Sequence, residues 1–242
     1  MARHATLASP SRSSGNFDVP KLARSTLNDE VYESLKEALI QGRIAPGSTM
    51  TIRSLAASFG ISMMPVREAL RRLVAEHVLV MLPNRSVALP VFTAERFHEV
   101  TQIRFALEGL AAEEGARHIT PEKIAHMIHM TEKMERETDN DATARLGWNT
   151  EFHFTLYRAS GMSTLVALIE GLWLQIGPLL NLPITELYER TPGYFFEHHH
   201  RAIEGLKAGR PADVRKAILG DISAAAQTIA ERLSSVTAQQ RT

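Results

Sequence analysis

Hydrophobic residues in the first third of the chain recur with the spacing of amphipathic helices. A first helix, which Asn28 or Asp29 can cap and which ends at Gly42, has an expected buried face of Val31, Leu35, Ala38 and Leu39. Residues 53–73 then fit two short helices around Gly60, which allows a tight turn where a side chain would clash. The expected apolar side of this pair consists of Ala56, Phe59, Ile61, Val66, Leu70 and Leu73. The pattern predicts a helix-turn-helix.

The second helix of this pair is short, amphipathic and basic. Ser62 can cap its start, and Pro65 is tolerated in the first turn because the N–H that proline lacks has no helical partner there. The helix then displays Arg67, Arg71 and Arg72. Such a helix suits the major groove of DNA, although an ordinary helix pair with a solvated basic face would show the same pattern.

Two short runs of β-favouring residues, 78–81 and 87–91, flank the turn-forming stretch Pro83-Asn84-Arg85-Ser86. Turn residues between such runs indicate a β-hairpin. A hairpin directly after a helix-turn-helix predicts a wing, whose tip residues Asn84 and Arg85 would reach the minor groove or the DNA backbone.

From residue 93 onward, helix-length segments alternate with stop signals, and we find no further strand pattern. Thr93 can cap a helix that reaches about residue 118. Further helices are expected at 121–138, 142–159, 163–182 with a bend at Gly177-Pro178, 192–209 and 211–236. Repeated stops at this spacing favour an antiparallel bundle. The predicted fold is mainly α: an N-terminal winged helix-turn-helix with a small β-hairpin, then a C-terminal all-α bundle.

Composition and charge divide the chain further. Residues 1–20 are rich in Ser, Ala and Arg without apolar periodicity, so we expect a disordered arm. Residues 1–92 hold 11 Lys/Arg and 7 Asp/Glu, a balance of +4, whereas residues 93–242 hold 16 and 20, a balance of −4. A basic part on an acidic remainder fits one part touching phosphates. We expect a DNA-binding domain at 21–91 and a helical effector-binding and dimerisation domain at 92–238.

The chain of 242 residues contains no cysteine, which excludes a disulfide framework and a thiolate metal site or nucleophile. No apolar run reaches the roughly 18 residues of a membrane span, and the N-terminus lacks the apolar core of a signal peptide. These features lead us to expect a cytoplasmic protein without a membrane partner.

Four polar side chains on the predicted bundle helices form a candidate metal site: Asn149, His153, His199 and Asp221. Asn149 and His153 share one helix face because they are four residues apart. Bundle cores build metal sites from facing helices, and two imidazoles with oxygen ligands suit Zn²⁺, Ni²⁺ or Mn²⁺. A polar pair at this spacing also occurs without any metal. Within 198–200 the register stays open, with His199 favoured.

Arg104 in the first long helix is a candidate anion-binding residue. It lies four residues before Glu108, so an intrahelical ion pair is one interpretation. The other is that its guanidinium faces a cavity and grips a carboxylate through its fork of donors. Aromatic residues that could line such a pocket, or simply belong to the core, are Trp148, Tyr157, Trp173 and Tyr194.

Residues 27–90 resemble the winged helix-turn-helix domain of GntR-type bacterial transcription regulators. The matching stretches are VYESLKEALIQGRIAPGSTM, LAASFGIS, PVREALRRLVAEHVLV and the wing-like MLPNRSVALP. The resemblance implies DNA contacts by Arg53, Ser62, Arg67 and Arg85, and we expect Arg71 and Asn84 to contact DNA as well. Among these, Arg67 is expected to read a base edge, in particular guanine, while Arg53 and Ser62 hold phosphates.

Two residues depart from the pattern of that family. Met63 stands where the common Ser-Arg-x-Pro-Val-Arg sequence has its first arginine, and Ser86 replaces the usual wing glycine. Because the lost arginine would make a strong contact, we expect an unusual operator sequence or a lower affinity.

Residues 92–236 are similar to the helical FCD domain, the effector-binding domain of FadR-type GntR regulators. The matching stretches are QIRFALEGLAAEEGA, NTEFHFTLYRASG and HHHRAIEGLKAGRP. The usual metal ligands of that family, an Asp and three His, fall here on Asn149, His153, His199 and Asp221. Asn replaces Asp at the first position and Asp replaces His at the last, which implies a retained but altered site. The resemblance also implies effector binding by Arg104, Asn149, His153 and His199.

The sequence therefore predicts a ligand-responsive bacterial transcription regulator, and a repressor in particular. It would bind a palindromic double-stranded DNA operator as a homodimer, because two-fold proteins match inverted repeats. Its effector would be a small organic acid held by the metal and Arg104, which shifts DNA affinity only if it binds one domain arrangement better.

Two alternatives stay open at this point. A metal-dependent helical enzyme acting on a small carboxylate could use His153 or His199 as a base, with the metal activating water. Against an enzyme, the sequence shows no nucleophile-base motif, Gly-rich phosphate loop or HExxH pattern. The other alternative is a metal-free regulator that responds to fatty acyl-CoA.

Overall fold

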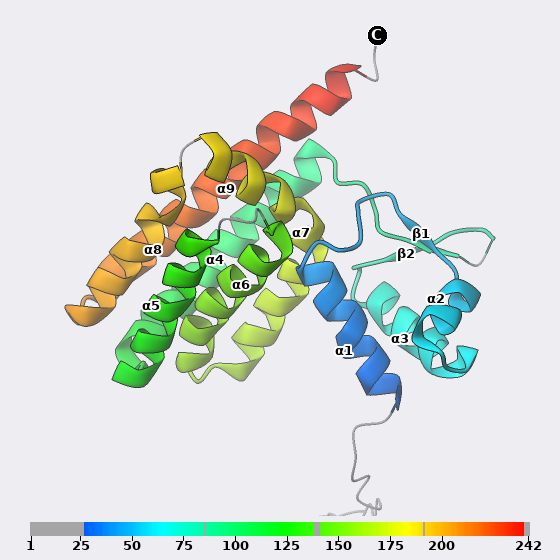
Figure 1. The fold of residues 1–242 in the computed structure, drawn as a ribbon, viewed down its shortest axis with the longest axis horizontal. Coiled ribbons are helices and arrows are strands. Elements are labelled where there is room, and N and C mark those ends of the chain that lie inside the picture. Colours follow the sequence, from blue (N-terminus) through cyan, green and yellow to red (C-terminus); the bar gives the residue numbers. More distant parts are fainter. Residues whose placement is uncertain (1–26, 85, 138–140, 191, 240–242) are drawn as a thin grey trace, which may run out of the picture.

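The structure, a computed structural model, describes residues 27–84, 86–137, 141–190 and 192–239. It is mainly helical with one small antiparallel sheet, and it consists of an N-terminal winged helix-turn-helix and a C-terminal helical bundle (Figure 1). This arrangement confirms the predicted fold class. The arm expected at 1–20 and the wing residue Arg85 lie outside the described residues.

The N-terminal part combines short helices with very short strands. Its elements are α1 (Leu27–Ile40), β1 (Thr49–Met50), α2 (Ile52–Phe59), α3 (Met63–Ala75), β2 (Val80–Met81) and β3 (Val87–Ala88). Strand β3 lies between β1 and β2 and is antiparallel to both, with Val87 opposite Met50 and Met81. The β2–β3 hairpin is the predicted wing. Strand β1 was not predicted, because two residues are too few to show a period-2 pattern.

The turn between α2 and α3 has the predicted geometry at Gly60, whose φ of 68° lies in the left-handed region that glycine adopts without strain. Two other predictions for this pair were wrong. Ser62 occupies the N-cap of α3 but makes no capping hydrogen bond, because the residue three positions on is Pro65, which has no N–H to donate. The Phe59 side chain is 38% exposed, since it ends α2, beyond the turn in which Ala56 is buried.

In the part of the chain that the structure describes, the C-terminal bundle consists of six helices: α4 (Ala94–His118), α5 (Pro121–Arg136), α6 (Ala142–Ala159), α7 (Ser163–Arg190), α8 (Pro192–Lys207) and α9 (Pro211–Gln239). Thr93, Thr120 and Asp141 cap α4, α5 and α6 through side-chain oxygens that accept a backbone N–H. Close packing pairs α4 and α8 with α9, and α5 with α6. Within the described residues, no helix combines the length and apolarity needed to cross a membrane.

Helix α7 passes through Gly177-Pro178 and continues to Arg190, so the predicted end near residue 182 was wrong. Pro183 removes one helical hydrogen bond just beyond the predicted end, but the helix does not stop there. A Cβ added at Gly177 would lie 2.7 Å from the Leu39 carbonyl oxygen at the end of α1. The glycine therefore lets α7 approach α1 backbone to backbone.

Two hydrophobic cores hold the molecule together, one in each part. The N-terminal core contains Val31, Leu35 and Leu39 of α1 and Val66, Leu70 and Leu73 of α3, as the apolar pattern predicted. It also contains one residue of the bundle, Leu174 of α7, which is 2% exposed. The N-terminal core is therefore completed by the helical part, and α7 belongs to both.

Candidate functional site

Three side chains from different bundle helices converge in the interior: His153 of α6, His199 of α8 and Asp221 of α9. Their ligand atoms all lie within 4.8 Å of one another. Asp221 bridges the rings, with Oδ2 3.2 Å from His153 Nε2 and Oδ1 3.6 Å from His199 Nε2. The side chains of His153, His199 and Asp221 are 1%, 0% and 16% exposed. We call these residues the His-His-Asp cluster.

Burial and mutual contact set the charges of this cluster. Burial lowers the pKa of the His199 imidazole to about 4, so the ring is neutral at neutral pH. Burial would raise the pKa of Asp221, but the hydrogen bond that it accepts from His153, and its electrostatic interactions with the His199 and His153 rings, outweigh that effect and hold it at about 2. A neutral imidazole and an ionised carboxylate are the forms in which these groups bind metal ions.

A line of buried hydrogen bonds runs from His153 to α4. His153 Nδ1 lies 3.1 Å from the hydroxyl oxygen of Tyr157, and that hydroxyl donates to Glu108 Oε2 at 2.7 Å. Glu108 Oε1 in turn accepts from Arg104 Nε at 2.6 Å. Sequence spacing indicated the pair Arg104–Glu108, but the Tyr157 bridge depends on the packing of α4 against α6 and carries no sequence signal.

Arg104 forms the intrahelical ion pair that its spacing predicted, and the pair is buried, with side-chain exposures of 4% for Arg104 and 0% for Glu108. The guanidinium carbon also lies 5.5 Å from the centre of the Trp173 ring. That ring is in turn 5.4 Å from the ring of His153. Arg104 therefore lies in the same buried polar region as the His-His-Asp cluster.

The three consecutive histidines of α8 have different surroundings. His199 is the member that joins the cluster. His200 is exposed and pairs with Glu135 at 2.7 Å. The ring of His198 approaches α9 at Gly220, where an added Cβ would lie 2.5 Å from it. This arrangement agrees with the register favoured by the sequence.

Asn149 is buried one helical turn before His153 on α6. Of the aromatic candidates, Tyr157 and Trp173 are buried beside the His153 ring, whereas the side chain of Tyr194 lies outside the described part of the chain. Two of the predicted aromatic residues thus lie beside the polar region.

The donor set and its spacing fit a divalent cation. Two ligands that bind one tetrahedral ion at about 2.0–2.1 Å lie about 3.4 Å apart. The two contacts of Asp221 with the histidines, at 3.2 and 3.6 Å, are close to that separation. Imidazole and carboxylate together suit Zn²⁺, Ni²⁺ or Mn²⁺. The residue types of the cluster and their convergence therefore fit such an ion.

The second candidate site is the outer face of the helix-turn-helix. Arg67 on α3 and Arg53 on α2 are exposed, and no carboxylate in the described part of the chain pairs with either. Arg71 pairs with Glu68 at 3.1 Å, but its side chain is 64% exposed. Ser62 is exposed as well. These four predicted DNA-contacting side chains therefore face solvent.

Arg72 has a structural role that the sequence did not separate from that of its neighbours. Its guanidinium lies 3.6 Å from the centre of the Tyr32 ring, and its Nε donates to Glu76 at 3.1 Å. The Tyr32 hydroxyl also donates to Glu76, at 2.7 Å. These contacts join α3 to α1, so Arg72 helps to hold α3 in place against α1.

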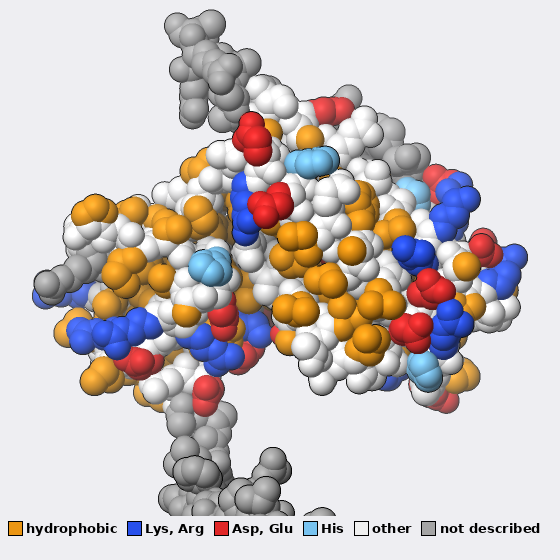
Figure 2. Space-filling view, turned by 180° about the vertical axis from the view of Figure 1, so that it is seen from behind, with side chains coloured by type: hydrophobic (Ala, Val, Ile, Leu, Met, Phe, Trp, Pro, Cys, Tyr) orange, Lys and Arg blue, Asp and Glu red, His pale blue; other side chains and the backbone are white. Residues whose placement is uncertain are grey.

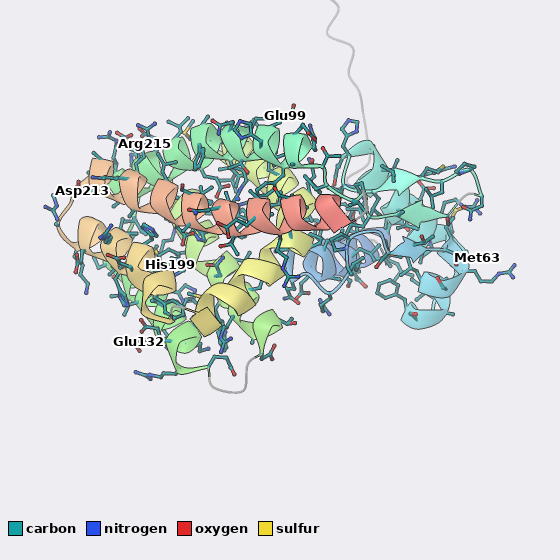
Figure 3. All side chains as sticks on the ribbon, turned by 90° about the horizontal axis from the view of Figure 1, so that it is seen from above. Met63, Glu99, Glu132, His199, Asp213 and Arg215 are labelled. Carbon is teal, nitrogen blue, oxygen red and sulfur yellow. The ribbon has the colours of Figure 1, made fainter. Side chains whose placement is uncertain are left out.

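The two departures from the family pattern have visible structural consequences. Met63, at the start of α3, leaves 48% of its surface exposed on the N-terminal domain, away from His199 in the bundle (Figure 3). Ser86 is buried, and both its backbone N–H and its hydroxyl donate to Asn84 Oδ1, at 3.1 and 2.6 Å. Asn84 therefore holds the wing turn together, with Ser86 as its partner.

A winged helix-turn-helix with outward-facing arginines, joined to a helical bundle with a buried polar cluster, defines a transcription regulator that combines a DNA-binding domain and a ligand-binding domain in one chain. Residues 27–89 match the family described as bacterial regulatory proteins, gntR family, and residues 99–224 match the FCD domain. The chain belongs to the GntR family and, because it carries an FCD domain, to its FadR subfamily.

Similar proteins are transcription regulators. The chain is 31% identical over 193 residues to the HTH-type transcriptional regulator McbR of Escherichia coli (strain K12), covering 78% of this chain and 86% of McbR. It is 24% identical over 206 residues to the probable D-xylose utilization operon transcriptional repressor of Paenarthrobacter nicotinovorans, covering 84% and 89%. The solved structure of E. coli McbR/YncC is similar with a TM-score of 0.73 and 28% identity, over 90% of this chain and 100% of that one. These findings confirm a DNA-binding regulator and not an enzyme.

Proposed function

We propose that this regulator is a repressor that releases a palindromic operator when a small organic acid binds in its helical domain. The observation that carries the proposal is the His-His-Asp cluster, buried beside Arg104 in the same chain as an outward-facing basic helix. The Paenarthrobacter nicotinovorans relative is named as a probable repressor, which supports repression rather than activation.

The His-His-Asp cluster, together with Asn149, would hold Zn²⁺, Ni²⁺ or Mn²⁺. A bound cation would supply a positively charged anchor for the carboxylate of the effector. His153, His199 and Asp221 come from three helices, so a metal in this position would also tie α6, α8 and α9 to one another.

Arg104 would provide the second contact for an effector carboxylate. Its ion pair with Glu108 uses the Nε edge of the guanidinium, so the two terminal Nη groups remain as its further donors. Because Glu108 balances its charge inside the protein, Arg104 can stay buried between effectors. An anion then finds a positioned donor fork in a region where water is largely excluded.

In the DNA complex, Arg67 would read a guanine edge. The DNA backbone would be contacted by Arg53, Ser62 and Arg71. The wing, with Asn84 and Arg85, would lie against the DNA groove. We assign DNA binding to a domain of residues 21–91 and effector binding to a domain of residues 92–238. A protein with this task would act in the cytoplasm, where bacterial DNA is found.

The helical domain would also form the homodimer. Ile103 and Leu110 of α4 are 40% and 42% exposed, and Leu107 lies between them at helical spacing. Hydrophobic side chains gather on this face of the bundle, which is turned toward the viewer in Figure 2. Apolar side chains that repeat along an exposed helix suit an isologous interface, in which each α4 packs against its copy.

Helix α7 offers a physical connection between the two sites. Trp173 contacts the region of Arg104 and His153, while the next residue, Leu174, is buried in the core of the DNA-binding domain. A displacement of α7 upon effector binding would therefore move both cores. An effector that favours one position of α7 would change how the two recognition helices of a dimer are spaced.

The proposal is tested by selecting an operator from a randomised DNA pool and measuring its affinity by fluorescence anisotropy, with and without Zn²⁺ and a panel of small carboxylates. We expect salt-sensitive binding that one or more carboxylates weaken. Binding that no carboxylate changes, but that long-chain acyl-CoA weakens in metal-free protein, would favour the acyl-CoA alternative instead.

A further inference from the structure

Tyr157 connects a proposed metal ligand to the first helix of the bundle without being a ligand itself. It lies one turn after His153 on α6, and its ring is buried. Its hydroxyl touches two groups, His153 Nδ1 at 3.1 Å and Glu108 Oε2 at 2.7 Å. The hydroxyl is therefore placed between an imidazole and a carboxylate.

The direction of these two hydrogen bonds follows from the groups involved. In the 2.7 Å contact between them, the Tyr157 hydroxyl is the donor and Glu108 Oε2 is the acceptor. Glu108, paired with Arg104, can only accept. The single hydroxyl hydrogen must then point to Glu108, and the hydroxyl oxygen accepts from His153 Nδ1–H.

This direction determines the tautomer of His153. Nε2 lies 3.2 Å from Asp221 inside the cluster, within hydrogen-bond reach of that carboxylate. When a cation takes the place of the hydrogen between them, a ring whose Nδ1 keeps its proton presents the lone pair of Nε2. The lone pair thus points to the place that a cation would share with Asp221 and His199. Histidine ligands commonly have their other nitrogen held in this way, and the holding residue tunes metal affinity.

We propose that Tyr157, anchored by Glu108, is the positioning residue that fixes the ring orientation and the Nδ1–H tautomer of His153 for metal binding. This inference rests on the proposed metal site. It also explains why Glu108 is fully buried opposite Arg104: the same carboxylate orients the metal ligand through Tyr157 and neutralises the arginine. A single buried acid thus links the two groups proposed to hold the effector.

The chain provides a closely matched control for this idea. Tyr32 donates to Glu76 at 2.7 Å, the same distance as from Tyr157 to Glu108, but it lies in the DNA-binding domain. Replacing either tyrosine by phenylalanine removes one hydroxyl that donates a hydrogen bond to one glutamate. Only Tyr157→Phe also removes the partner of His153.

The test measures the affinity of full-length protein for Zn²⁺ by competition with a chromophoric chelator. Tyr157→Phe is expected to bind Zn²⁺ about 10–100-fold more weakly, as is typical when the group that orients a metal-binding histidine is lost. Tyr32→Phe is expected to match the wild type. Equal Zn²⁺ affinity in folded Tyr157→Phe and wild type would overturn the assignment of Tyr157, whereas a wild type that binds no Zn²⁺ would overturn the metal site itself.

A second measurement needs no folded Tyr157 variant. Long-range ¹H–¹⁵N spectra of the wild type, with the His153 signals assigned by comparison with His153→Gln, report which ring nitrogen carries the proton. We expect Nδ1 of His153 to carry a proton both before and after Zn²⁺ is added, and Nε2 to be the nitrogen that coordinates the added Zn²⁺. An Nδ1 without a proton, or coordination through Nδ1, would contradict the inference.

Discussion

The two sites of this regulator use charged side chains in opposite physical settings. In the DNA-binding domain, Arg67 and Arg53 are exposed and have no acidic partner among the described residues. In the helical domain, Arg104 and His199 are buried, and Arg104 is paired with a fully buried acid. An exposed arginine stays hydrated, so it lowers the stability of the fold little and is available to bind a phosphate or a base. A buried polar group needs a hydrogen-bond partner inside the protein.

This contrast has a consequence for mutagenesis. Substitutions on the exposed surface should alter DNA binding while the fold stays intact. Substitutions in the buried region should alter ligand binding and stability together, because each removed group leaves a partner without its contact.

The largest effect is expected for His153→Ala combined with His199→Ala. With both imidazoles gone, Asp221 is the only charged ligand left in the cluster. The loss of metal affinity should exceed the roughly 10–100-fold typical of residues that merely orient a ligand. Metal content of protein purified without chelator, measured by mass spectrometry, should fall to background.

The control for the metal-site variant is His200→Ala, because that histidine is exposed and pairs with Glu135. It should retain the metal content of the wild type. Unaltered metal in the double variant would end the assignment of both histidines as ligands.

Leu174→Ala tests the junction between the two regions. This side chain is contributed by α7 but is buried in the core of the DNA-binding domain. Its truncation should lower the free energy of unfolding by about 2–5 kcal/mol, as for other large-to-small core changes. Leu168→Ala is a suitable control, because Leu168 lies on the same helix but is 55% exposed.

Thermal unfolding followed by circular dichroism would measure the change at the junction. If Leu174→Ala unfolds like the wild type, the two domains do not share a core in solution. In that case α7 could not transmit an effector signal in the way proposed.

Arg67→Ala tests the exposed arginine surface of the helix-turn-helix. Loss of a bidentate contact with guanine should weaken operator binding by about 1–3 kcal/mol for each half-site, enough to abolish specific recognition by a dimer. The melting temperature should not change, since the side chain is exposed and pairs with no described acid. Arg136→Ala, an exposed arginine of α5, serves as the control in the same anisotropy titration. Unchanged operator affinity would remove Arg67 as a reader.

The smallest effect is expected for Met63→Arg, which restores the residue usual in the family. Met63 is already 48% exposed at the start of α3, so an arginine fits without disturbing the core. One added phosphate contact should strengthen DNA binding and increase its dependence on salt by about one counterion per subunit. A salt titration of operator affinity would show no such increase if residue 63 does not face DNA.

Local signals made most of the fold predictable from the sequence. Thr93 caps α4, Gly60 turns the helix pair, and the wing follows α3 as expected. The failures arose where distant residues decide the structure. Helix α7 runs past Pro183, beyond the end predicted near residue 182, and β1 is visible only through its pairing with β3.

In the candidate sites, too, contacts within one helix were predictable from the sequence, whereas contacts between distant residues were not. The spacing of Arg104 and Glu108 indicated their ion pair, because both lie on one helix. Glu108 and Tyr157 are far apart in the sequence, so only the packing of α4 against α6 shows that they hold His153. Likewise, Arg72 looks like another DNA-reading arginine until its contacts with Tyr32 and Glu76 are seen.

The central claim is that the buried cluster controls the exposed reading surface. The most direct test is the operator affinity of zinc-loaded protein across a panel of small carboxylates, measured in parallel with the His153→Ala/His199→Ala variant. Our account predicts that at least one carboxylate weakens DNA binding by the wild type and that the variant binds the operator equally well but no longer responds. An equal response in both proteins would contradict it.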